Sequence, residues 1–331
     1  MQRLALTQIS EPAQSMQLLT DDEPTPGSGE ALVQMEAATI NPSDFLYVTG
    51  QYFLTPTPGT TIGSEGVGRV VAVGPDSDTA LIGKRVALLP TYRHGTWATY
   101  TTALATDLIV VPDGGDALQL AMLGINPMTA LRLLRDYGAP DAPQRWIGQT
   151  AGNSAVGEYL VKLAHHFGHR TLNVVRREQA AKDVASWGAD RVVIDGPNLD
   201  ADITDALAGN TLDVAVDSIG GPSSTVLGHH LRYDGTLVTY AFISGKPSEL
   251  SILDLIGNHA NLTGFWLHNW WQRAALAQVR DEYQQLVDLI TDGTLSARVN
   301  RTFALDDWRE AIDVAQTHSR DGKLLFTFPT D

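Results

Sequence analysis

The 331-residue chain contains no cysteine. This absence excludes disulfide bonds, thiolate nucleophiles and any zinc or iron–sulfur site that is held by cysteine. Hydrophobic residues make up 43% of the chain and charged residues 18%, a balance that is typical of globular proteins. The sequence also lacks internal repeats and low-complexity tracts.

Positive charge is scarce as well. The chain has 23 Lys and Arg against 38 Asp and Glu, which gives a formal net charge of −15. This charge disfavours nucleic acid or an anionic membrane surface as a partner, and it leaves backbone amides and a few basic residues to hold any phosphate. No apolar run is long enough to span a membrane, and the first residues are too polar for a signal peptide. With no cysteine, we expect a cytoplasmic protein.

The length of the chain predicts two domains. The first part, up to about Asp113, has short β-rich runs that are separated by Pro and Gly clusters. These runs are Ala31–Thr39, Gly68–Val73, Arg85–Leu89, Thr96–Thr102 and Leu108–Val111. Within this part, Asn41-Pro42 is typical of a helix start, with Asn41 as the cap and Pro42 at the first helical position.

From about Asp116 onward, strand and helix patterns alternate. A helical stretch is interrupted at Asn126-Pro127, and six short apolar strands with helical crossovers follow, which predicts an α/β fold with a doubly wound parallel sheet. The strands are Trp146–Gln149, Thr171–Val175, Arg191–Ile194, Leu212–Asp217, Thr236–Tyr240 and Leu262–Trp266. The chain ends in a strand, Lys323–Phe328, which we expect to pack on the first β-rich part. The predicted domains are therefore 1–117 continued by 268–331, and 118–267, with a ligand cleft between them.

The turn after the first of these six strands is typical of a dinucleotide phosphate site. The run Gly152-Asn153-Ser154-Ala155-Val156-Gly157 has glycines at the outer two positions of the G-x-G-x-x-G pattern and Ser154 at the middle one. The first position allows a tight turn, the small middle residue lets the backbone approach a pyrophosphate, and Gly157 lets the helix pack on its strand. A glycine pattern alone is weak support.

The end of the next strand indicates which dinucleotide would bind. In an NAD site an acidic residue at this point bonds the ribose 2′-hydroxyl, but here Arg176 and Arg177 follow the strand, about 20 residues after the glycines. Guanidinium groups at this position suit a 2′-phosphate. We therefore predict NADPH as the cofactor. The alternative is that one or both arginines are simply solvated surface residues.

The sequence as a whole resembles the medium-chain dehydrogenase/reductase superfamily. Gly63-Ser-Glu-Gly-Val-Gly68 is similar to its Gly-His-Glu-x-x-Gly motif, with Ser64 in place of the zinc-binding histidine. Asn41-Pro-Ser-Asp44 stands where zinc-dependent members place a cysteine ligand. The resemblance implies a mostly β GroES-like catalytic domain beside a Rossmann domain, and a zinc-independent enzyme of the quinone and enoyl reductase branch.

Within that branch the sequence resembles the mitochondrial-type trans-2-enoyl-CoA or enoyl-acyl-carrier-protein reductases. The matching runs are Gly50-Gln-Tyr52, Gly124-Ile-Asn-Pro-Met-Thr-Ala130, Asn153–Gly157, Asn173–Arg176, Thr236–Tyr240 and Gly264–Leu267. The resemblance implies that Tyr52 takes part in catalysis and that Trp266 lines and shapes the reaction site. It also implies that five residues lie near the nicotinamide or its ribose: Asn126, Thr129, Tyr240, Phe265 and Leu267. Asn41 is a further predicted cofactor-binding residue.

The reaction that this resemblance implies is conjugate reduction. NADPH would give hydride to the β carbon of an enoyl thioester, while Tyr52 would act as the hydrogen-bond donor or acid. Each residue also has a plainer interpretation: Tyr52 and Trp266 as packing residues, Asn41 as a helix cap and Glu65 as a structural acid. Two other functions remain open, namely reduction of quinones or simple enones, and a non-catalytic NADPH-binding role. The region Thr236–Trp266, where superfamily members pair sheet edges, predicts a homodimer.

Overall fold

The computed structural model describes residues 1–138, 144–317 and 321–329. The chain forms two compact units: unit 1 comprises Met1–Ile125 and Ala274–Asp331, and unit 2 comprises Asn126–Arg273. Our sequence prediction placed the boundaries at 117/118 and 267/268. The structure has these boundaries at 125/126 and 273/274 instead, so helix α3 (Ala117–Ala121) belongs to unit 1 and helix α10 (Leu267–Arg273) belongs to unit 2.

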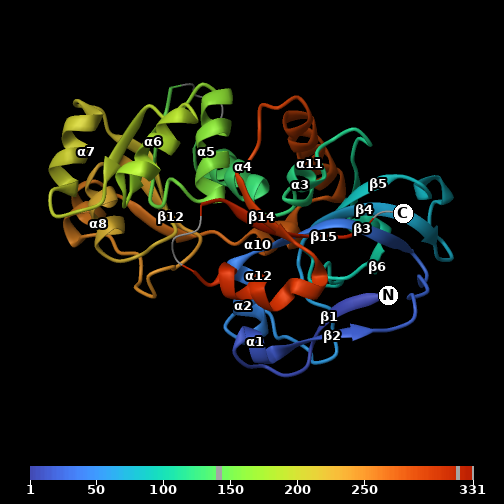
Figure 1. Ribbon diagram of the computed structural model, residues 1–331. Coiled ribbons are helices and arrows are strands. Elements are labelled where there is room, and N and C mark those ends of the chain that lie inside the picture. The colour runs from blue at the N-terminus through green and yellow to red at the C-terminus, as the bar shows by residue number, and fades with distance from the viewer. Residues whose placement is uncertain (139–143, 318–320, 330–331) are drawn as a thin grey trace. The chain divides into compact units, whose positions relative to one another are not determined.

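Unit 2 is built on a six-stranded sheet in the order β10-β9-β8-β11-β12-β13, in which every pair is parallel. This order confirms the predicted doubly wound sheet. The strands are β8 (Trp146–Gln149), β9 (Arg170–Val175), β10 (Arg191–Ile194), β11 (Leu212–Asp217), β12 (Leu231–Thr239) and β13 (Asn261–Gly264). The apolar runs of β8, β9 and β11 are buried because helices cover both faces of the sheet (Figure 1).

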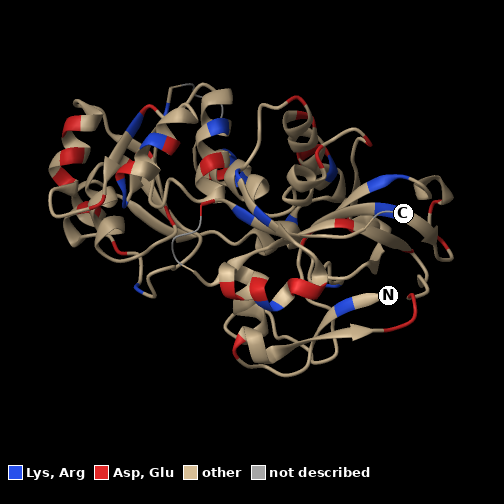
Figure 2. Ribbon diagram, in the orientation of Figure 1, with Lys and Arg blue, Asp and Glu red and all other residues tan. Residues whose placement is uncertain are grey.

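The helices of unit 2 are α4 (Asn126–Tyr137), α5 (Ala155–His166), α6 (Glu178–Ser186), α7 (Leu199–Leu207), α8 (Pro222–His229), α9 (Ile252–Gly257) and α10. Helix α5 packs along α4 and buries Leu160, Leu163 and Ala164, which recur every three or four residues. In contrast, α7 carries three exposed aspartates, which colour segments of its ribbon red in Figure 2.

Two predicted element bounds in unit 2 are wrong. Strand β13 ends at Gly264, so Trp266 does not lie in a strand but directly precedes α10. Strand β12 begins at Leu231, earlier than the predicted Thr236, because the polar run after Leu231 is also extended and includes a register shift against β11. Neither segment has the continuous apolar pattern on which the prediction relied.

Unit 1 contains the hairpin β1–β2 and a seven-stranded sheet in the order β14-β15-β3-β4-β5-β7, with β6 paired to β3. The C-terminal β15 pairs antiparallel with β3, as the sequence predicts, and Leu325 lies opposite Thr39. The strands are β1 (Gln2–Leu6), β2 (Met16–Thr20), β3 (Glu30–Ile40), β4 (Gly66–Val73), β5 (Arg85–Leu88), β6 (Tyr100–Leu104), β7 (Leu108–Val110), β14 (Val299–Phe303) and β15 (Lys323–Thr327). Sequence prediction missed β1 and β2 as separate strands and placed β6 four residues too early.

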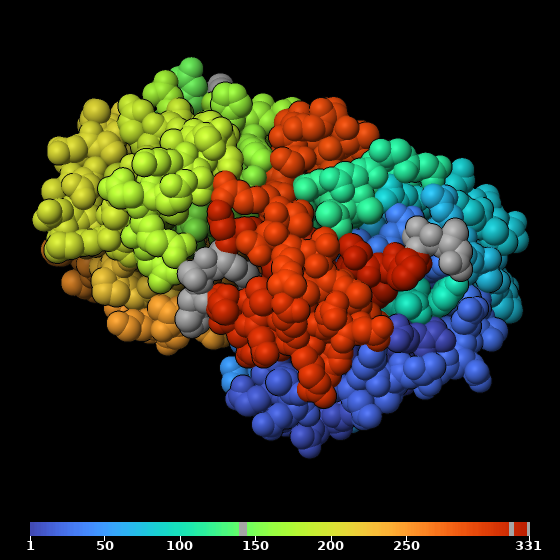
Figure 3. All heavy atoms as spheres, viewed as in Figure 1, coloured from blue at the N-terminus to red at the C-terminus, as the bar shows by residue number. Residues whose placement is uncertain are grey.

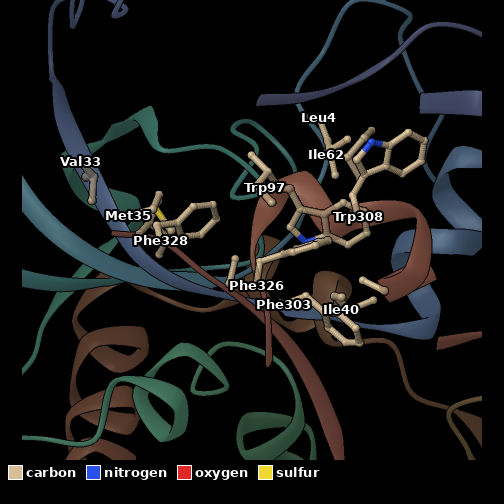
Figure 4. Close-up of a cluster of buried hydrophobic side chains, with 14 of the residues drawn as sticks. Leu4, Val33, Met35, Ile40, Ile62, Trp97, Phe303, Trp308, Phe326 and Phe328 are labelled. Carbon is tan, nitrogen blue, oxygen red and sulfur yellow. The ribbon is translucent and has the colours of Figure 1, made fainter. Parts of the chain in front are cut away.

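The core of unit 1 joins its two chain segments. Trp97 is fully buried, donates a hydrogen bond from Nε1 to the carbonyl of Thr39 at 2.8 Å, and contacts Phe326 edge to face at 5.3 Å. Figure 4 shows Trp308 and Leu4 in the same cluster. In Figure 3 the C-terminal atoms, in orange and red, lie against the blue N-terminal part of the same unit. Burial of several aromatic side chains, each about 150–250 Å², stabilises this association.

The α-helices of unit 1 that the structure describes are α1 (Pro12–Ser15), α2 (Pro42–Val48), α3, α11 (Leu276–Thr291) and α12 (Trp308–Ala315). Helix α2 starts as predicted, with Asn41 as its cap and Pro42 at the first position. The Tyr283 hydroxyl on α11 donates a 2.7 Å hydrogen bond to the carbonyl of Gly124. Of the helices that the structure describes, none has the length and hydropathy needed to cross a membrane.

Candidate functional site

The predicted phosphate turn joins β8 to α5. Ser154 caps the helix, since its Oγ accepts a 3.0 Å hydrogen bond from the amide of Gly157. A Cβ on Gly157 would lie 2.5 Å from the carbonyl oxygen of Gly152, and a Cβ on Gly152 would lie 2.8 Å from the Cβ of Asn173. Neither glycine can therefore be replaced without moving the backbone. The geometry leaves the first amides of α5 without intrahelical partners, which is the arrangement that binds phosphate.

Two buried amide side chains, those of Gln149 and Asn173, hold this turn through hydrogen bonds. Gln149 donates hydrogen bonds to the carbonyl of Gly157 at 3.1 Å and to Oδ1 of Asn173 at 2.6 Å. Asn173 in turn donates to the hydroxyl of Thr171 and to the carbonyl of Arg191. The sequence analysis did not assign Gln149 a role. A glutamine inside an otherwise apolar strand is the signal that could have identified it, because a buried amide needs partners.

Arg176 and Arg177 lie at the end of β9, one strand away from the turn in the sheet. Both are exposed, and Arg177 is the N-cap residue of α6. Within the described part of the chain, neither guanidinium makes a hydrogen bond or an ion pair with another side chain. The nearby acid after β10, Asp195, accepts a 2.9 Å hydrogen bond from Ser223. The two arginines are therefore available to an anionic ligand.

Tyr240 follows β12, on the other side of the turn in the sheet. Its backbone amide donates to the carbonyl of Asp217 at 3.0 Å. Burial raises the pKa of the Tyr240 phenol, an effect that its hydrogen-bonding neighbours Ser218 and Ser154 partly oppose. The structure thus brings Tyr240 together with Ser154 of the phosphate turn. Asp217 itself is fully buried and accepts from Thr150 and Ser248.

Helix α4 begins with two further predicted residues, Asn126 and Thr129, which are both buried. The side-chain Nδ2 of Asn126 has no hydrogen-bond partner among the described residues. A buried donor without a partner is costly, at about 1–3 kcal/mol, so it calls for a ligand or water that accepts the bond. This orphaned donor fits a bound cofactor.

Phe265 and Trp266 form the short link between β13 and α10, and Leu267 is the first residue of α10. Leu267 is buried, whereas Phe265 and Trp266 are partly exposed. The indole ring of Trp266 stacks on His268 with ring centroids 4.7 Å apart. The stack fixes the ring at the start of α10, a position from which it can form a wall of a pocket.

In unit 1, a buried polar network surrounds the N-terminus of α2. Asp44 accepts hydrogen bonds from the amide of Asn41 and the hydroxyl of Ser64, both at 2.8 Å. Glu65 accepts from the side chain of Asn41 at 2.9 Å and from the amide of Ile125 at 2.7 Å. The ammonium group of Lys323 donates to Asn41. All of these side chains except Ile125 are at most 7% exposed.

Burial dominates the electrostatics of this network. Burial raises the pKa of Asp44 from 3.8 to about 7, and it also raises the pKa of Glu65, while the positive charge of Lys323 lowers both. Sequence analysis missed Lys323, although a lysine that leads an otherwise apolar strand is an unusual residue. Because the carboxyl groups of Asp44 and Glu65 share the single ammonium group of Lys323, negative charge on them is only partly compensated.

These residues do not fit a zinc ion. The motif position of the histidine ligand is occupied by Ser64, whose hydroxyl is hydrogen-bonded to Asp44. The oxygens of Glu65 are held by Asn41, Thr39 and a backbone amide, and an ammonium group lies in the same network. In the described ranges, no three His, Cys, Asp or Glu side chains are grouped as metal ligands would be.

Tyr52 lies just after α2, and its amide donates to the carbonyl of Leu46 at 3.0 Å. Its ring is partly exposed and packs at 5.5 Å from the ring of Tyr92, which in turn is 5.6 Å from Tyr47. The neighbouring Phe53 is 69% exposed. Sequence analysis did not identify Tyr92, because its loop has no periodic pattern.

Comparison with known proteins is consistent with this arrangement. Residues 27–113 match the alcohol dehydrogenase GroES-like domain, and residues 155–292 match the zinc-binding dehydrogenase family. The mitochondrial enoyl-[acyl-carrier-protein] reductase of Bos taurus is 32% identical over 326 residues, which cover 96% of this chain and 86% of the relative. The Xenopus tropicalis protein of the same name is 33% identical, covering 93% and 89%.

The chain therefore belongs to the medium-chain dehydrogenase/reductase family, in its enoyl reductase and quinone oxidoreductase-like group. It is an oxidoreductase of that family. A candidate NADPH:quinone reductase from Bacillus thuringiensis has the same fold, with a TM-score of 0.90 at 27% identity over 99% of both chains. A mutant enoyl thioester reductase from Candida tropicalis, at 22% identity and a TM-score of 0.84 over 99% of both chains, supports the fold alone.

Proposed function

We propose that the protein reduces the C=C bond of an α,β-unsaturated thioester, a trans-2-enoyl-CoA or enoyl-acyl-carrier-protein, with NADPH. The observation that carries this proposal is the full-length similarity to relatives named enoyl-[acyl-carrier-protein] reductase at 32–33% identity. The packing of Tyr52 against the ring of Tyr92 supports it, because the reaction needs a positioned acid.

NADPH fits the residues of unit 2. We infer that the amides of Asn153, Ala155 and Val156 at the start of α5 hold the pyrophosphate, close to Gly152, Ser154 and Gly157. Arg176 and Arg177 would hold the 2′-phosphate through charge-assisted hydrogen bonds. Asn126, with its orphaned donor, would contact the nicotinamide half together with Thr129, Tyr240, Phe265 and Leu267. Asn41 of unit 1 is the remaining proposed contact, and its helix-capping role is already satisfied in the structure.

When bound, NADPH supplies the hydride that adds to the β carbon. The protein residues supply the rest. Negative charge develops on the thioester oxygen as the hydride arrives, and a hydrogen-bond donor aimed at that oxygen lowers the barrier. Tyr52 is the proposed donor and the proposed acid for the α carbon, since a phenol can serve in either role. Trp266, which does no proton chemistry, would shape the substrate pocket and exclude water.

The alternative is reduction of quinones or simple enones by the same site. The similarity to a candidate NADPH:quinone reductase at 27% identity favours it. A non-catalytic NADPH-binding role is a third possibility, which the net charge of −15 makes unsuited to RNA.

One experiment separates these functions. NADPH oxidation is measured in parallel with crotonyl-CoA, a quinone and a simple enone. We expect the highest kcat/KM with crotonyl-CoA. A higher value with the quinone or the enone would favour the alternative, and no turnover with any of them would favour the non-catalytic role.

We also propose a homodimer. Strand β13 is an edge strand of the sheet, and among the described residues eight of the fourteen exposed large apolar side chains come from residues 233–262. An edge strand flanked by exposed apolar residues is suited to pairing with a second copy. The expected cytoplasmic location and the absence of zinc remain predictions, and the curated relatives are mitochondrial by name.

A further inference from the structure

The loop that carries Tyr92 has a strained backbone. Tyr92 has φ = 59°, in the left-handed region that residues other than glycine rarely adopt. Such a conformation costs about 1–3 kcal/mol and persists only where the surroundings hold it. Strain of this kind at a bulky aromatic residue points to a function of its side chain.

One buried carboxylate holds the loop on both sides of Tyr92. The hydroxyl of Thr91 donates to Oδ2 of Asp107 at 2.8 Å, and Nε of Arg93 donates to the same oxygen at 3.1 Å. The Nη2 atom of Arg93 also donates to Oδ1. Because Asp107 is only 1% exposed and contacts both neighbours of Tyr92, it holds the loop segment from which the tyrosine ring projects.

That ring lies against Tyr52. The two ring centroids are 5.5 Å apart at an interplanar angle of 43°, and Tyr47 packs on the other side of Tyr92 at 5.6 Å. Tyr52 and Ser43 are hydrogen-bonding neighbours of the Tyr92 phenol. Tyr92 also lines a cavity of about 310 Å³ within unit 1, together with Asp44 and Tyr47, which is polar and large enough to hold water.

The chemistry of the step sets the direction of the hydrogen bond between the two phenols. Burial raises the pKa of Tyr92 well above its ordinary value, so this phenol keeps its proton. A phenol that has given up its proton leaves an oxygen that can only accept hydrogen bonds. When Tyr52 acts as the acid, Tyr92 is therefore the donor and the oxygen of Tyr52 the acceptor.

We propose that Tyr92 is a positioning residue for proton transfer: it donates a hydrogen bond to the Tyr52 oxygen and thereby orients the Tyr52 proton toward the substrate. This inference rests on the proposed role of Tyr52 as the acid. In that step the O–H bond of Tyr52 breaks, a C–H bond forms at the α carbon, and the negative charge left on the Tyr52 oxygen is stabilised by the Tyr92 hydroxyl. Because Tyr52 is partly exposed, a proton from bulk solvent then restores the phenol.

A double-mutant cycle tests this proposal in the full-length enzyme. The variants are Tyr92→Phe, Tyr52→Phe and the two combined, and kcat, KM and the NADPH Kd are measured with crotonyl-CoA. A hydrogen bond to a charged group predicts that Tyr92→Phe lowers kcat about tenfold or more, while KM and Kd change less than about twofold. Because Tyr92 acts through Tyr52, adding Tyr92→Phe to Tyr52→Phe should cause no further loss.

Tyr47→Phe is the matched control, since it removes a hydroxyl from the same ring cluster. The Tyr47 hydroxyl has no hydrogen-bond partner among the described residues, so the kcat of the Tyr47→Phe variant should stay within about twofold of wild type. A kcat for Tyr92→Phe near that of wild type, or additive losses in the double variant, would overturn the inference while leaving the role of Tyr52 intact. Undiminished kcat in Tyr52→Phe would overturn both.

Discussion

The ammonium group of Lys323 donates a hydrogen bond to the side-chain oxygen of Asn41, 282 positions earlier in the sequence. This contact links the start of β15 to the N-terminus of α2. The side-chain nitrogen of Asn41 in turn donates a hydrogen bond to the carboxylate of Glu65. One lysine thus partly compensates the buried carboxyl groups of Asp44 and Glu65, in a place where zinc-dependent relatives of this fold would be expected to hold a metal.

Removal of that ammonium group should destabilise the protein. Lys323→Met leaves Glu65 and Asp44 buried without their cation, and loss of one partner of a buried ionic group costs about 3 kcal/mol. Urea unfolding at pH 7 measures this change in the free energy of unfolding. The control is Lys182→Met at an exposed position, where the change should stay within about 0.5 kcal/mol. Equal effects at both sites would contradict the assigned role of Lys323.

Asp44 should make stability depend on pH. Its pKa is about 7 in the folded state against an ordinary value of 3.8, so the folded state binds this proton more tightly. The stabilisation that the proton provides is complete below pH 3.8 and is lost as the pH rises toward 7. Asp44→Asn mimics the protonated form. Its carbonyl oxygen can still accept a hydrogen bond from the amide of Asn41, and its NH2 group can donate one to the hydroxyl of Ser64.

We therefore expect the free energy of unfolding of wild type, relative to Asp44→Asn, to fall between about pH 4 and pH 7 and then to level off. Urea unfolding of both proteins across this range gives the difference directly. Glu65 and Lys323 are present in both proteins, so most of their titration cancels. A difference that does not change with pH would show that Asp44 keeps its ordinary acidity.

Local patterns predicted most of unit 2. The bounds of β8 and β11 were predicted correctly, because central parallel strands are short apolar runs between turns. The bounds of the edge strand β10 were also predicted correctly. The phosphate turn was also predictable, since its six residues are consecutive. The network around Asn41 was not, because it depends on the register of β15 against β3, which no local pattern encodes. The same holds for Tyr92, whose position is set by Asp107.

The packing of Gly157 predicts a specific loss of cofactor binding. In Gly157→Ala the new methyl group would lie 2.5 Å from a backbone oxygen, so the turn must shift away from the pyrophosphate. We expect the NADPH Kd to rise at least about tenfold, or about 1.4 kcal/mol. Gly196→Ala is the control, because its Cβ would meet no atom within 4 Å. Fluorescence titration with NADPH measures both, and unchanged affinity in Gly157→Ala would argue against the turn as the phosphate site.

The exposed arginines predict the choice between the two nicotinamide cofactors. Arg176→Ala removes a guanidinium proposed to bind the 2′-phosphate, which NADH lacks. Affinity for NADPH should fall about tenfold or more, while affinity for NADH stays within about twofold. Arg177→Ala, measured in the same way, shows which of the two residues carries the contact. Equal losses for both cofactors would mean that the arginine serves the fold rather than the phosphate.

The exposed apolar residues of α9 predict how the homodimer can be broken. Leu253 and Ile256 are 78% and 77% exposed in the single chain, although large apolar residues rarely remain so accessible unless a partner covers them. Wild type should elute as a dimer in gel filtration, and Leu253→Asp/Ile256→Asp as a folded monomer, since two buried carboxylates without partners outweigh the apolar contact. Leu276→Asp, at a 43% exposed position on α11, should leave the dimer intact. A wild-type protein that elutes as a monomer would refute the dimer, and a dimeric double variant would place the interface elsewhere.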